Sequence, residues 1–465
     1  MRRLVCLLLF VALAGTCHAQ WAAKVDPRFE LTSIVFRLVG AQEYSQCGIP
    51  SYAADIDEYF ADYAEHPVVS FARQIRAIHS IGYNAVSGTA DWLVIEDGHV
   101  KLSPEYVFKE AAKADSRWTP SLLRRYVKLL DDFYRETDFQ KFYDNHAELY
   151  RYAESQLDNL MAEVDPEWFV SFYGKEFGDP DIFIGMCNGP SNYALVSGSR
   201  KSGYGIVVGC NSDNNGRPAY NPLFLTIILH ELGHNFSNPL SEQYWPEMEV
   251  AADIIYPHVA EIMAMQAYAD ARIVTGEWFN NLCVAMCYRE MGSPYYDYVV
   301  NGYQASGYVW MRRAVEFMDE FYADRERYPH ISDFMPRIVE FYDSVAADYD
   351  EIEREYNEQL PAIAEITPAA GSTVSADALP SELVVRFSKP MSGGYGANWV
   401  DDPQVIAIPL DGGCYWRDEC TLVYPLKTDQ LESGKTYGLM LLGWAFVSAD
   451  GYALPGYHDV TFTVE

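Results

Sequence analysis

The chain has 465 residues, of which 49% are hydrophobic and 22% are charged, and this composition excludes a wholly disordered protein. Acidic residues outnumber basic residues by 66 to 34, and a formal net charge of -32 makes nucleic acids and anionic membrane surfaces poor partners. After the N-terminal segment, no apolar run reaches the roughly 20 residues that a membrane-spanning helix needs.

The N-terminal segment has the features of a secretory signal peptide. Two arginines precede an apolar stretch at residues 4–14, which is too short to span a bilayer, and residues 17–19 (CHA) offer a cleavage site between small residues. We therefore expect residues 1–19 to be removed after Ala19 and the protein to be exported to the periplasm, the cell surface or the medium. Lipidation of Cys17 is the alternative, but the residues before it lack the large aliphatic side chain of a lipobox.

Export would place the cysteines in an oxidising compartment. Nine cysteines are present, and two of them leave with the signal peptide, so an odd number remains and a monomer keeps at least one unpaired thiol. Cys414 and Cys420 are candidates to close a small loop, and Cys187 and Cys210 are a weaker candidate pair. The absence of CxxC motifs argues against a cysteine-based structural zinc site.

Hydrophobic periodicity predicts the elements that follow the signal peptide. Alternation predicts a strand at residues 30–39, and helical spacing predicts helices at residues 52–64, 67–81, 120–134 and 142–164. Between residues 168 and 220, short apolar runs (FVSFYG, DIFIGMC, NYALVSG and YGIVVGC) separated by turn residues predict strands.

The pattern changes twice more before the C-terminus. Residues 223–360 again have helical spacing, whereas short strand-like runs separated by turn residues begin at Pro361. About 100 residues of this kind are typical of a β-sandwich. The expected fold class is therefore α+β, with a mostly helical domain and a small mixed sheet at residues 20–360, followed by a β-sandwich domain at residues 361–465.

The segment FLTIILHELGHNF contains the motif that indicates chemistry. His230 and His234 are four residues apart, so on a helix both imidazoles project from one face and can bind one ion. Glu231 follows the first histidine and can act on a water molecule at the metal without binding the ion. The simpler alternative is a buried helix whose two histidines only form hydrogen bonds. The acid between the paired histidines, in an exported chain, favours zinc binding.

A catalytic zinc site needs a third protein ligand and an open position. The metzincin pattern requires a histidine six residues after His234, where Leu240 stands, and the reversed motif HxxEH is absent. An acidic residue on a later helix, as in gluzincins, remains. The candidates are Glu242, Glu247, Glu249, Asp253, Glu261, Glu277 and Glu290. Glu261 lies in apolar sequence, where burial would require a partner, and Glu277 begins the apolar run EWFNNLCVAMCY.

The segment HELGHNFSNPL resembles a family of exported bacterial zincin-like proteins known as a domain of unknown function. The resemblance extends to ELTSIVFRLVG, GYNAV and YPHISDFMPRIVEFYDSV and covers about residues 28–347. In that family a glutamate opens an apolar helix downstream of the motif, and Glu277 is the matching position. The family's usual Arg-Ala pair is replaced here by Asn281-Leu282. The resemblance implies that Glu277, rather than Glu261, is the third zinc ligand. The C-terminal region resembles a bacterial Ig-like domain.

These observations predict an exported zinc metallopeptidase that hydrolyses peptide or protein substrates, with Glu231 as the general base. The alternative is a non-catalytic, zinc-containing binding protein for proteins or glycans, and zinc-dependent hydrolysis of a non-peptide amide would use the same residues. Asn192 and Tyr193 are candidates for a peptide-binding edge strand or a simple turn. The candidates for an oxyanion-stabilising residue are Tyr303, Tyr308 and His258.

Overall fold

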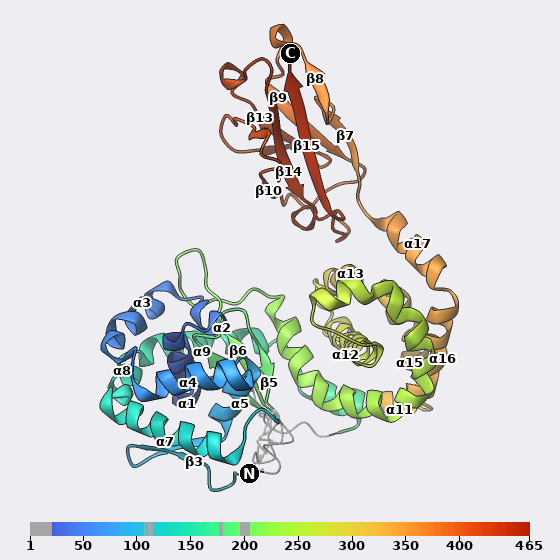
Figure 1. Ribbon diagram of the computed structural model, residues 1–465. Coiled ribbons are helices and arrows are strands. Elements are labelled where there is room, and N and C mark those ends of the chain that lie inside the picture. Colours follow the sequence, from blue (N-terminus) through green and yellow to red (C-terminus); the bar gives the residue numbers. More distant parts are fainter. Residues whose placement is uncertain (1–20, 107, 109–114, 176–179, 196–204) are drawn as a thin grey trace, which may run out of the picture. The chain divides into compact units, whose positions relative to one another are not determined.

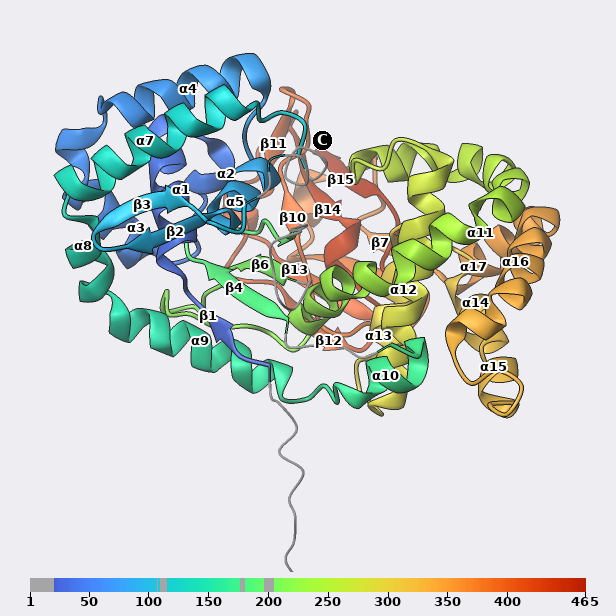
Figure 2. The same ribbon diagram turned by 90° about the horizontal axis from the view of Figure 1, so that it is seen from below.

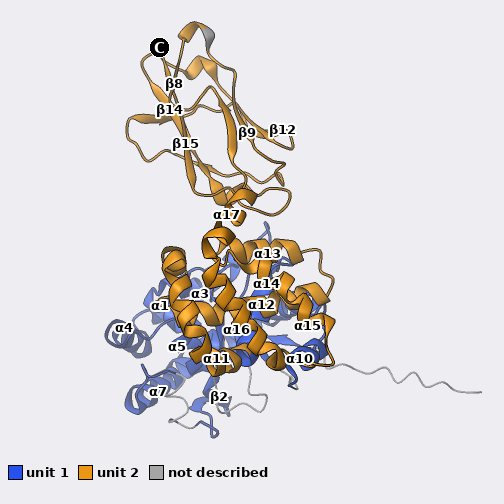
Figure 3. Ribbon diagram, turned by 90° about the vertical axis from the view of Figure 1, so that its right-hand side faces the viewer, with its two compact units in different colours: residues 1–236 blue, residues 237–465 orange. Residues whose placement is uncertain are grey.

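The computed structural model describes residues 21–106, 108, 115–175, 180–195 and 205–465, so the expected signal peptide lies outside the described residues. The fold is mixed α and β, with about half of the residues in helices, as the predicted α+β class requires. The chain divides into two compact units, residues 1–236 and 237–465, coloured blue and orange in Figure 3. The division falls inside the long helix α11 (Phe224–Met265).

A small mixed sheet forms part of the first unit. Its strand order is β1 (Ala23–Lys24), β4 (Asp181–Gly185), β6 (Gly205–Gly209) and β5 (Tyr193–Ala194). The first three of these strands are labelled in Figure 2. The first three strands are parallel, and β5 pairs with β6 in the antiparallel direction at one edge. Strand β6 is buried along its whole length, which explains its continuous apolar sequence. The strands predicted at DIFIGMC and YGIVVGC are thus confirmed.

The strand predicted at residues 30–39 is wrong, because this segment lies in helix α1 (Pro27–Val39). The side chain of Asp26 caps the helix by accepting a hydrogen bond from the Arg28 N–H, and Gly40 ends it in the left-handed conformation. Eight consecutive residues from Phe29 to Phe36 are buried, so the apolar pattern carries no clear period. The capping residues were the informative signal.

The run FVSFYG, also predicted as a strand, lies in helix α10 (Glu167–Tyr173). Its aromatic residues have high strand propensity, but they pack against each other, with Trp168 and Phe172 stacked one helical turn apart at a centroid distance of 4.6 Å. Tertiary packing therefore overrides the local preference. Gly174 ends the helix in the left-handed conformation.

The remaining elements of the first unit are mostly helices. They are α2 (Gln42–Ser45), α3 (Pro50–Tyr59), α4 (Pro67–His79), α5 (Asn84–Asp91), α7 (Pro120–Glu136), α8 (Phe139–Asn145) and α9 (Ala147–Met161), with the hairpin β2 (Leu93–Glu96) and β3 (His99–Leu102). Helices α3, α4, α7 and α9 confirm the helices predicted at residues 52–64, 67–81, 120–134 and 142–164, whereas α2, α5 and the hairpin of β2 and β3 were not predicted. Helix α1 packs on the sheet, where Phe29 stacks on Phe183 of β4 at a centroid distance of 4.3 Å.

The second unit begins with the rest of α11 and continues as helices. They are α12 (Ala271–Glu290), α13 (Tyr296–Ala305), α14 (Met311–Phe317), α15 (Asp319–Ala323), α16 (Ile331–Ala347) and α17 (Tyr349–Gln359). Helix α11 contains Pro239, Pro246 and Pro257, each of which removes one backbone hydrogen bond, and the helix follows an arc in Figure 1. Helix α12 is buried around almost its whole circumference.

Strands replace helices after α17, close to the predicted residue 361. One sheet has the order β10 (Ala397–Asn398), β14 (Thr436–Leu442), β15 (Tyr457–Val464) and β8 (Ser372–Val374), with β11 (Val405–Ala407) also on β14. The other has the order β12 (Tyr415–Asp418), β13 (Thr421–Pro425), β9 (Glu382–Phe387) and β7 (Ile363–Thr367). Side chains of both sheets, including Leu422 and Val460, share one apolar core.

Two further features bear on the sequence-based expectations. Over the part of the chain that the structure describes, no helix combines the length and the apolar character that crossing a membrane requires. The seven described cysteines are all free thiols, so neither Cys414 with Cys420 nor Cys187 with Cys210 forms a disulfide in the structure.

A fully buried carboxyl group lies where α1 meets the turn after β4. Glu30 accepts hydrogen bonds from the Met186 N–H (2.8 Å) and the Tyr52 hydroxyl (2.7 Å), and Tyr52 is hydrogen-bonded to Tyr150 (2.8 Å). Burial without a cationic partner among these contacts raises the pKa of Glu30 to about 8, although both hydrogen bonds act in the opposite direction. The carboxyl group is therefore protonated in the folded protein at neutral pH.

We predict that Glu30 makes the stability of the protein fall as the pH rises from 4.5 to about 8. Over this range the unfolded chain releases the proton that the folded chain keeps, so the free energy of unfolding decreases by at most about 1.4 kcal/mol per pH unit. Glu30→Gln should remove this slope in urea denaturation at several pH values, whereas Glu58→Gln, at an exposed position of α3, should keep it. An unchanged slope in Glu30→Gln would contradict the assignment.

Candidate metal centre

The HExxH motif lies in the first turns of α11. The helix begins after Asn221, whose side-chain oxygen accepts a hydrogen bond from the Phe224 N–H (3.1 Å). The apolar residues of the motif segment, Leu225, Ile228, Leu229, Leu232 and Phe236, are buried. His230, Glu231 and His234 are only partly buried, so they line the more open side of the helix. The predicted helix and the orientation of the histidine pair are thus observed.

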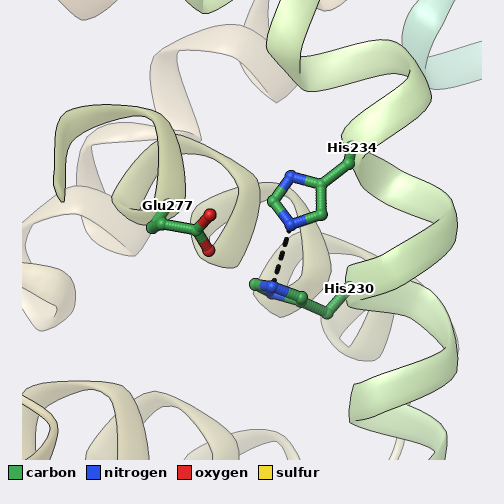
Figure 4. Close-up of side chains that lie close together, drawn as sticks. All are labelled: His230, His234 and Glu277. Atoms are coloured by element: carbon green, nitrogen blue, oxygen red, sulfur yellow. Dashed lines mark hydrogen bonds between the residues drawn. The ribbon is translucent and has the colours of Figure 1, made fainter. Parts of the chain in front are cut away.

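The two imidazoles meet at their Nε2 atoms. His230 Nε2 and His234 Nε2 are 3.0 Å apart, and the rings are nearly perpendicular at 82° (Figure 4). Two nitrogens bound to one tetrahedral zinc ion, each at 2.0–2.1 Å, are about 3.3–3.4 Å apart. The observed pair is close to that separation.

The carboxylate of Glu277 completes the group from a different helix, α12, and points toward both rings in Figure 4. One ligand atom from each of His230, His234 and Glu277 can be chosen so that all three lie within 4.8 Å of one another. Among the described residues, this is the one group of three histidine, cysteine or acidic side chains that meets this criterion. Two imidazole nitrogens and one carboxylate oxygen are ligands that zinc accepts.

Helix α12 is fixed at the point where it carries Glu277. The side chain of Asp270 caps the helix by accepting a hydrogen bond from the Ile273 N–H (2.9 Å). Trp278, the residue after Glu277, is fully buried and stacks on Tyr342 of α16 at a centroid distance of 4.6 Å. The carboxylate itself accepts a hydrogen bond from the Tyr268 hydroxyl (3.2 Å). Ligands of metal sites are commonly oriented by such outer hydrogen bonds.

Glu261, the alternative third ligand, does not join the group. It is exposed on α11, about seven helical turns beyond His234. The apolar sequence around it suggested burial, but Glu261 lies on the solvent side of the helix, while Val259 and Met263 are buried. Of the other candidates, Glu242 forms an ion pair with Arg272. Glu247, Glu249, Asp253 and Glu290 also lie outside the metal-binding group.

Two of the three predicted oxyanion-stabilising candidates lie near Glu277. The hydroxyl oxygens of Tyr303 and Tyr308 are buried and have no hydrogen-bond partner within the described chain. Burial raises the pKa of both groups, and the nearby negative charge of Glu277 raises it further. His258 instead stacks on Tyr349 of α17 at a centroid distance of 4.2 Å.

Tyr268 is the residue of the site that sequence reasoning missed. It lies in the connection between α11 and α12, nine residues before Glu277. The chain contains 35 tyrosines, and nothing in the local sequence distinguishes this one. Tyr193 lies in edge strand β5, and Asn192 lies just before the strand. Peptide binding at this edge stays a prediction. The Asn192 side chain accepts a hydrogen bond from the Gly209 N–H (3.0 Å).

A comparison with known protein families gives a match to a family without an assigned function. The family described as a domain of unknown function (DUF4932) matches residues 24–341, a range that contains His230, His234 and Glu277. No curated protein matches the chain in sequence.

We predict that His230→Ala and Glu277→Ala each weaken the binding of Zn²⁺ by more than about 100-fold, because each removes a ligand, and that Tyr268→Phe weakens it by about 10-fold. Competition with a chelator of known zinc affinity measures these changes. Glu261→Ala is the matched control and should bind zinc like the parent. Weaker zinc binding by Glu261→Ala together with unchanged zinc binding by Glu277→Ala would show that Glu277 is not the third ligand.

Proposed function

Since the chain belongs to the family described as a domain of unknown function (DUF4932), its activity has to be inferred from its own residues, and we propose that it is a zinc-dependent metallopeptidase. The observation that carries the proposal is the convergence of His230, His234 and Glu277 beside Glu231. The histidines and Glu277 hold the ion, and Glu231 is left for catalysis. An HExxH helix with a later glutamate ligand is the arrangement of gluzincin-type zincins.

The ligand chemistry favours zinc over the hard cations. Ca²⁺ and Mg²⁺ prefer sites made of oxygen atoms, whereas two imidazoles and one carboxylate suit Zn²⁺. Three protein ligands leave a fourth position open, which is typical of catalytic rather than structural zinc sites. When bound, Zn²⁺ supplies a Lewis acid that polarises the scissile carbonyl group and makes water acidic enough to attack at neutral pH.

Glu231 performs the proton transfers in this proposal. Its carboxylate takes a proton from the attacking water, so that a new C–O bond forms at the carbonyl carbon. The same carboxyl group then gives the proton to the peptide nitrogen as the C–N bond breaks, and one water is consumed for each bond cleaved. Tyr268 orients Glu277, the third ligand, through its hydrogen bond. The carboxylate therefore needs no contact with the substrate to keep this orientation.

The surrounding architecture is consistent with this assignment. We assign residues 20–360 to a zincin-like domain, supported by the motif helix α11, the ligand-bearing helix α12 and the mixed sheet with an antiparallel edge strand β5. The C-terminal strands are assigned to an Ig-like β-sandwich, supported by two sheets that share one core. From the signal-peptide features of residues 1–19 we propose that the substrates are peptides or proteins outside the cytoplasm.

We predict that Glu231→Gln keeps the zinc content of the parent and lowers kcat/KM for peptide hydrolysis by at least about 100-fold, because it removes the general base and leaves the ligands in place. Zinc content is measured by elemental analysis, and cleavage is measured on a diverse peptide library with and without a chelator. Glu247→Gln, at an exposed position of α11, is the matched control and should cleave like the parent.

Two outcomes would contradict the proposal. Equal cleavage by Glu231→Gln and the parent would exclude Glu231 as the base. A parent protein that holds one zinc ion per chain but cleaves no member of the library would instead support the non-catalytic binding protein.

A further inference from the structure

The loop between α2 and α3 lies in backbone contact with two other segments of the first unit. Residues 46–48 of this loop lie against Gly189, in the turn that follows β4, and against Cys210, the residue after β6. A Cβ atom on Gly189 would lie 2.6 Å from the Gln46 carbonyl oxygen, closer than real Cβ atoms come, and one on Gly48 would collide with the carbonyl oxygen of Cys210. Gly189 also has a φ of +56°, which favours glycine. A side chain at either glycine would therefore force these segments apart.

This approach brings two cysteines together. The Cys47 thiol donates a hydrogen bond to the Met186 carbonyl oxygen (3.1 Å) and also lies 3.4 Å from the Ile49 carbonyl oxygen. Its side chain is also hydrogen-bonded to that of Cys187, the residue after Met186. Cys187 is completely buried, whereas Cys47 is partly exposed. A reagent in solution therefore reaches Cys47 first.

The two thiols differ in acidity. The contact with Cys187 lowers the pKa of Cys47, and the nearby guanidinium group of Arg37 acts in the same direction, although burial opposes both. The same contact raises the pKa of Cys187, and burial and the proximity of Glu30 raise it further. A lowered pKa and partial exposure favour Cys47 as the thiol that attacks a disulfide in solution, and Cys187 lies beside it as the second thiol.

Cys210, the partner expected from the sequence, has a different environment. Its side chain contacts the Asn211 carbonyl oxygen (3.7 Å) and is hydrogen-bonded to Tyr220. Burial raises the pKa of Cys210 to about 12, which makes this thiol unreactive. Cys187 is hydrogen-bonded to the Cys47 thiol, whereas Cys210 is hydrogen-bonded to Tyr220.

We propose that Cys47 and Cys187 form a disulfide bond when the protein meets a small-molecule disulfide such as oxidised glutathione. The Cys47 thiolate attacks one sulfur of the reagent, forms a mixed disulfide and releases one thiolate. The Cys187 thiol then loses its proton to solvent and attacks the Cys47 sulfur, which breaks the mixed disulfide and releases the second thiolate. The protein thiols lose two electrons and two protons, and one reagent disulfide becomes two thiols.

The bond would stabilise the first unit independently of any metal. It would link the segment after α2 to the turn after β4 and close a loop of more than 100 residues, and long loops gain most from a disulfide in the chain-entropy model. The same bond would also fix the turn in which Met186 donates to the buried Glu30 carboxyl group.

Peptide mapping of the folded, full-length protein tests the proposal. The reduced protein is incubated with oxidised glutathione, the remaining thiols are alkylated after denaturation, and the digest is analysed without reduction. We expect a peptide that links Cys47 to Cys187, and a Tm about 5–15 °C higher than that of the reduced protein. A link between Cys187 and Cys210, or alkylation of both Cys47 and Cys187, would overturn the proposal.

Serine variants provide matched controls. Cys210→Ser should keep the Cys47–Cys187 link and the gain in Tm on oxidation, whereas Cys47→Ser should lose both. If a variant fails to fold, the mapping of the parent protein still decides the question. A gain in Tm that persists in Cys47→Ser would show that another pair of thiols causes it.

Discussion

Two imidazole nitrogens that lie 3.0 Å apart repel each other when both present lone pairs, and the metal centre depends on how this repulsion is relieved. A proton on one ring or a cation between the rings is sufficient for the pair alone. The carboxylate of Glu277 adds a negative charge, and its ligand atom lies within 4.8 Å of the histidine ligand atoms. This charge favours a divalent cation over a single proton. A divalent cation satisfies all three side chains at once, whereas a proton satisfies only the histidine pair.

Helices α11 and α12 hold the three ligand side chains in position. The histidines need only the helical geometry of α11, because residues four apart share a face. Glu277 needs more, because the position of its carboxylate depends on the packing of α12. That helix is buried on nearly all sides, and its Asn280 accepts a hydrogen bond from the Ser237 hydroxyl of α11 (2.8 Å). A carboxylate held in this way is positioned before the ion arrives, which lowers the cost of ordering the site.

How much the sequence predicts depends on the range of the interactions. The helix of the HExxH motif, the two long parallel strands and the change to strands near residue 361 follow from local patterns. Residues 30–39 were misassigned because a segment buried on every side loses its period. The choice between Glu277 and Glu261 depended on which side of a helix faces solvent, which local sequence left open. The hydrogen bond of Tyr268 and the contact of Cys47 with Cys187 join segments whose approach only the folded chain reveals.

The most direct test of the metal centre is a crystal structure of the zinc-loaded protein with anomalous data collected at the zinc absorption edge. We predict one peak within about 2.0–2.2 Å of His230 Nε2, His234 Nε2 and a carboxylate oxygen of Glu277, with Glu231 outside bonding distance. The absence of a peak between these side chains, or a peak bound by the Glu231 carboxylate, would contradict the assignment of the site.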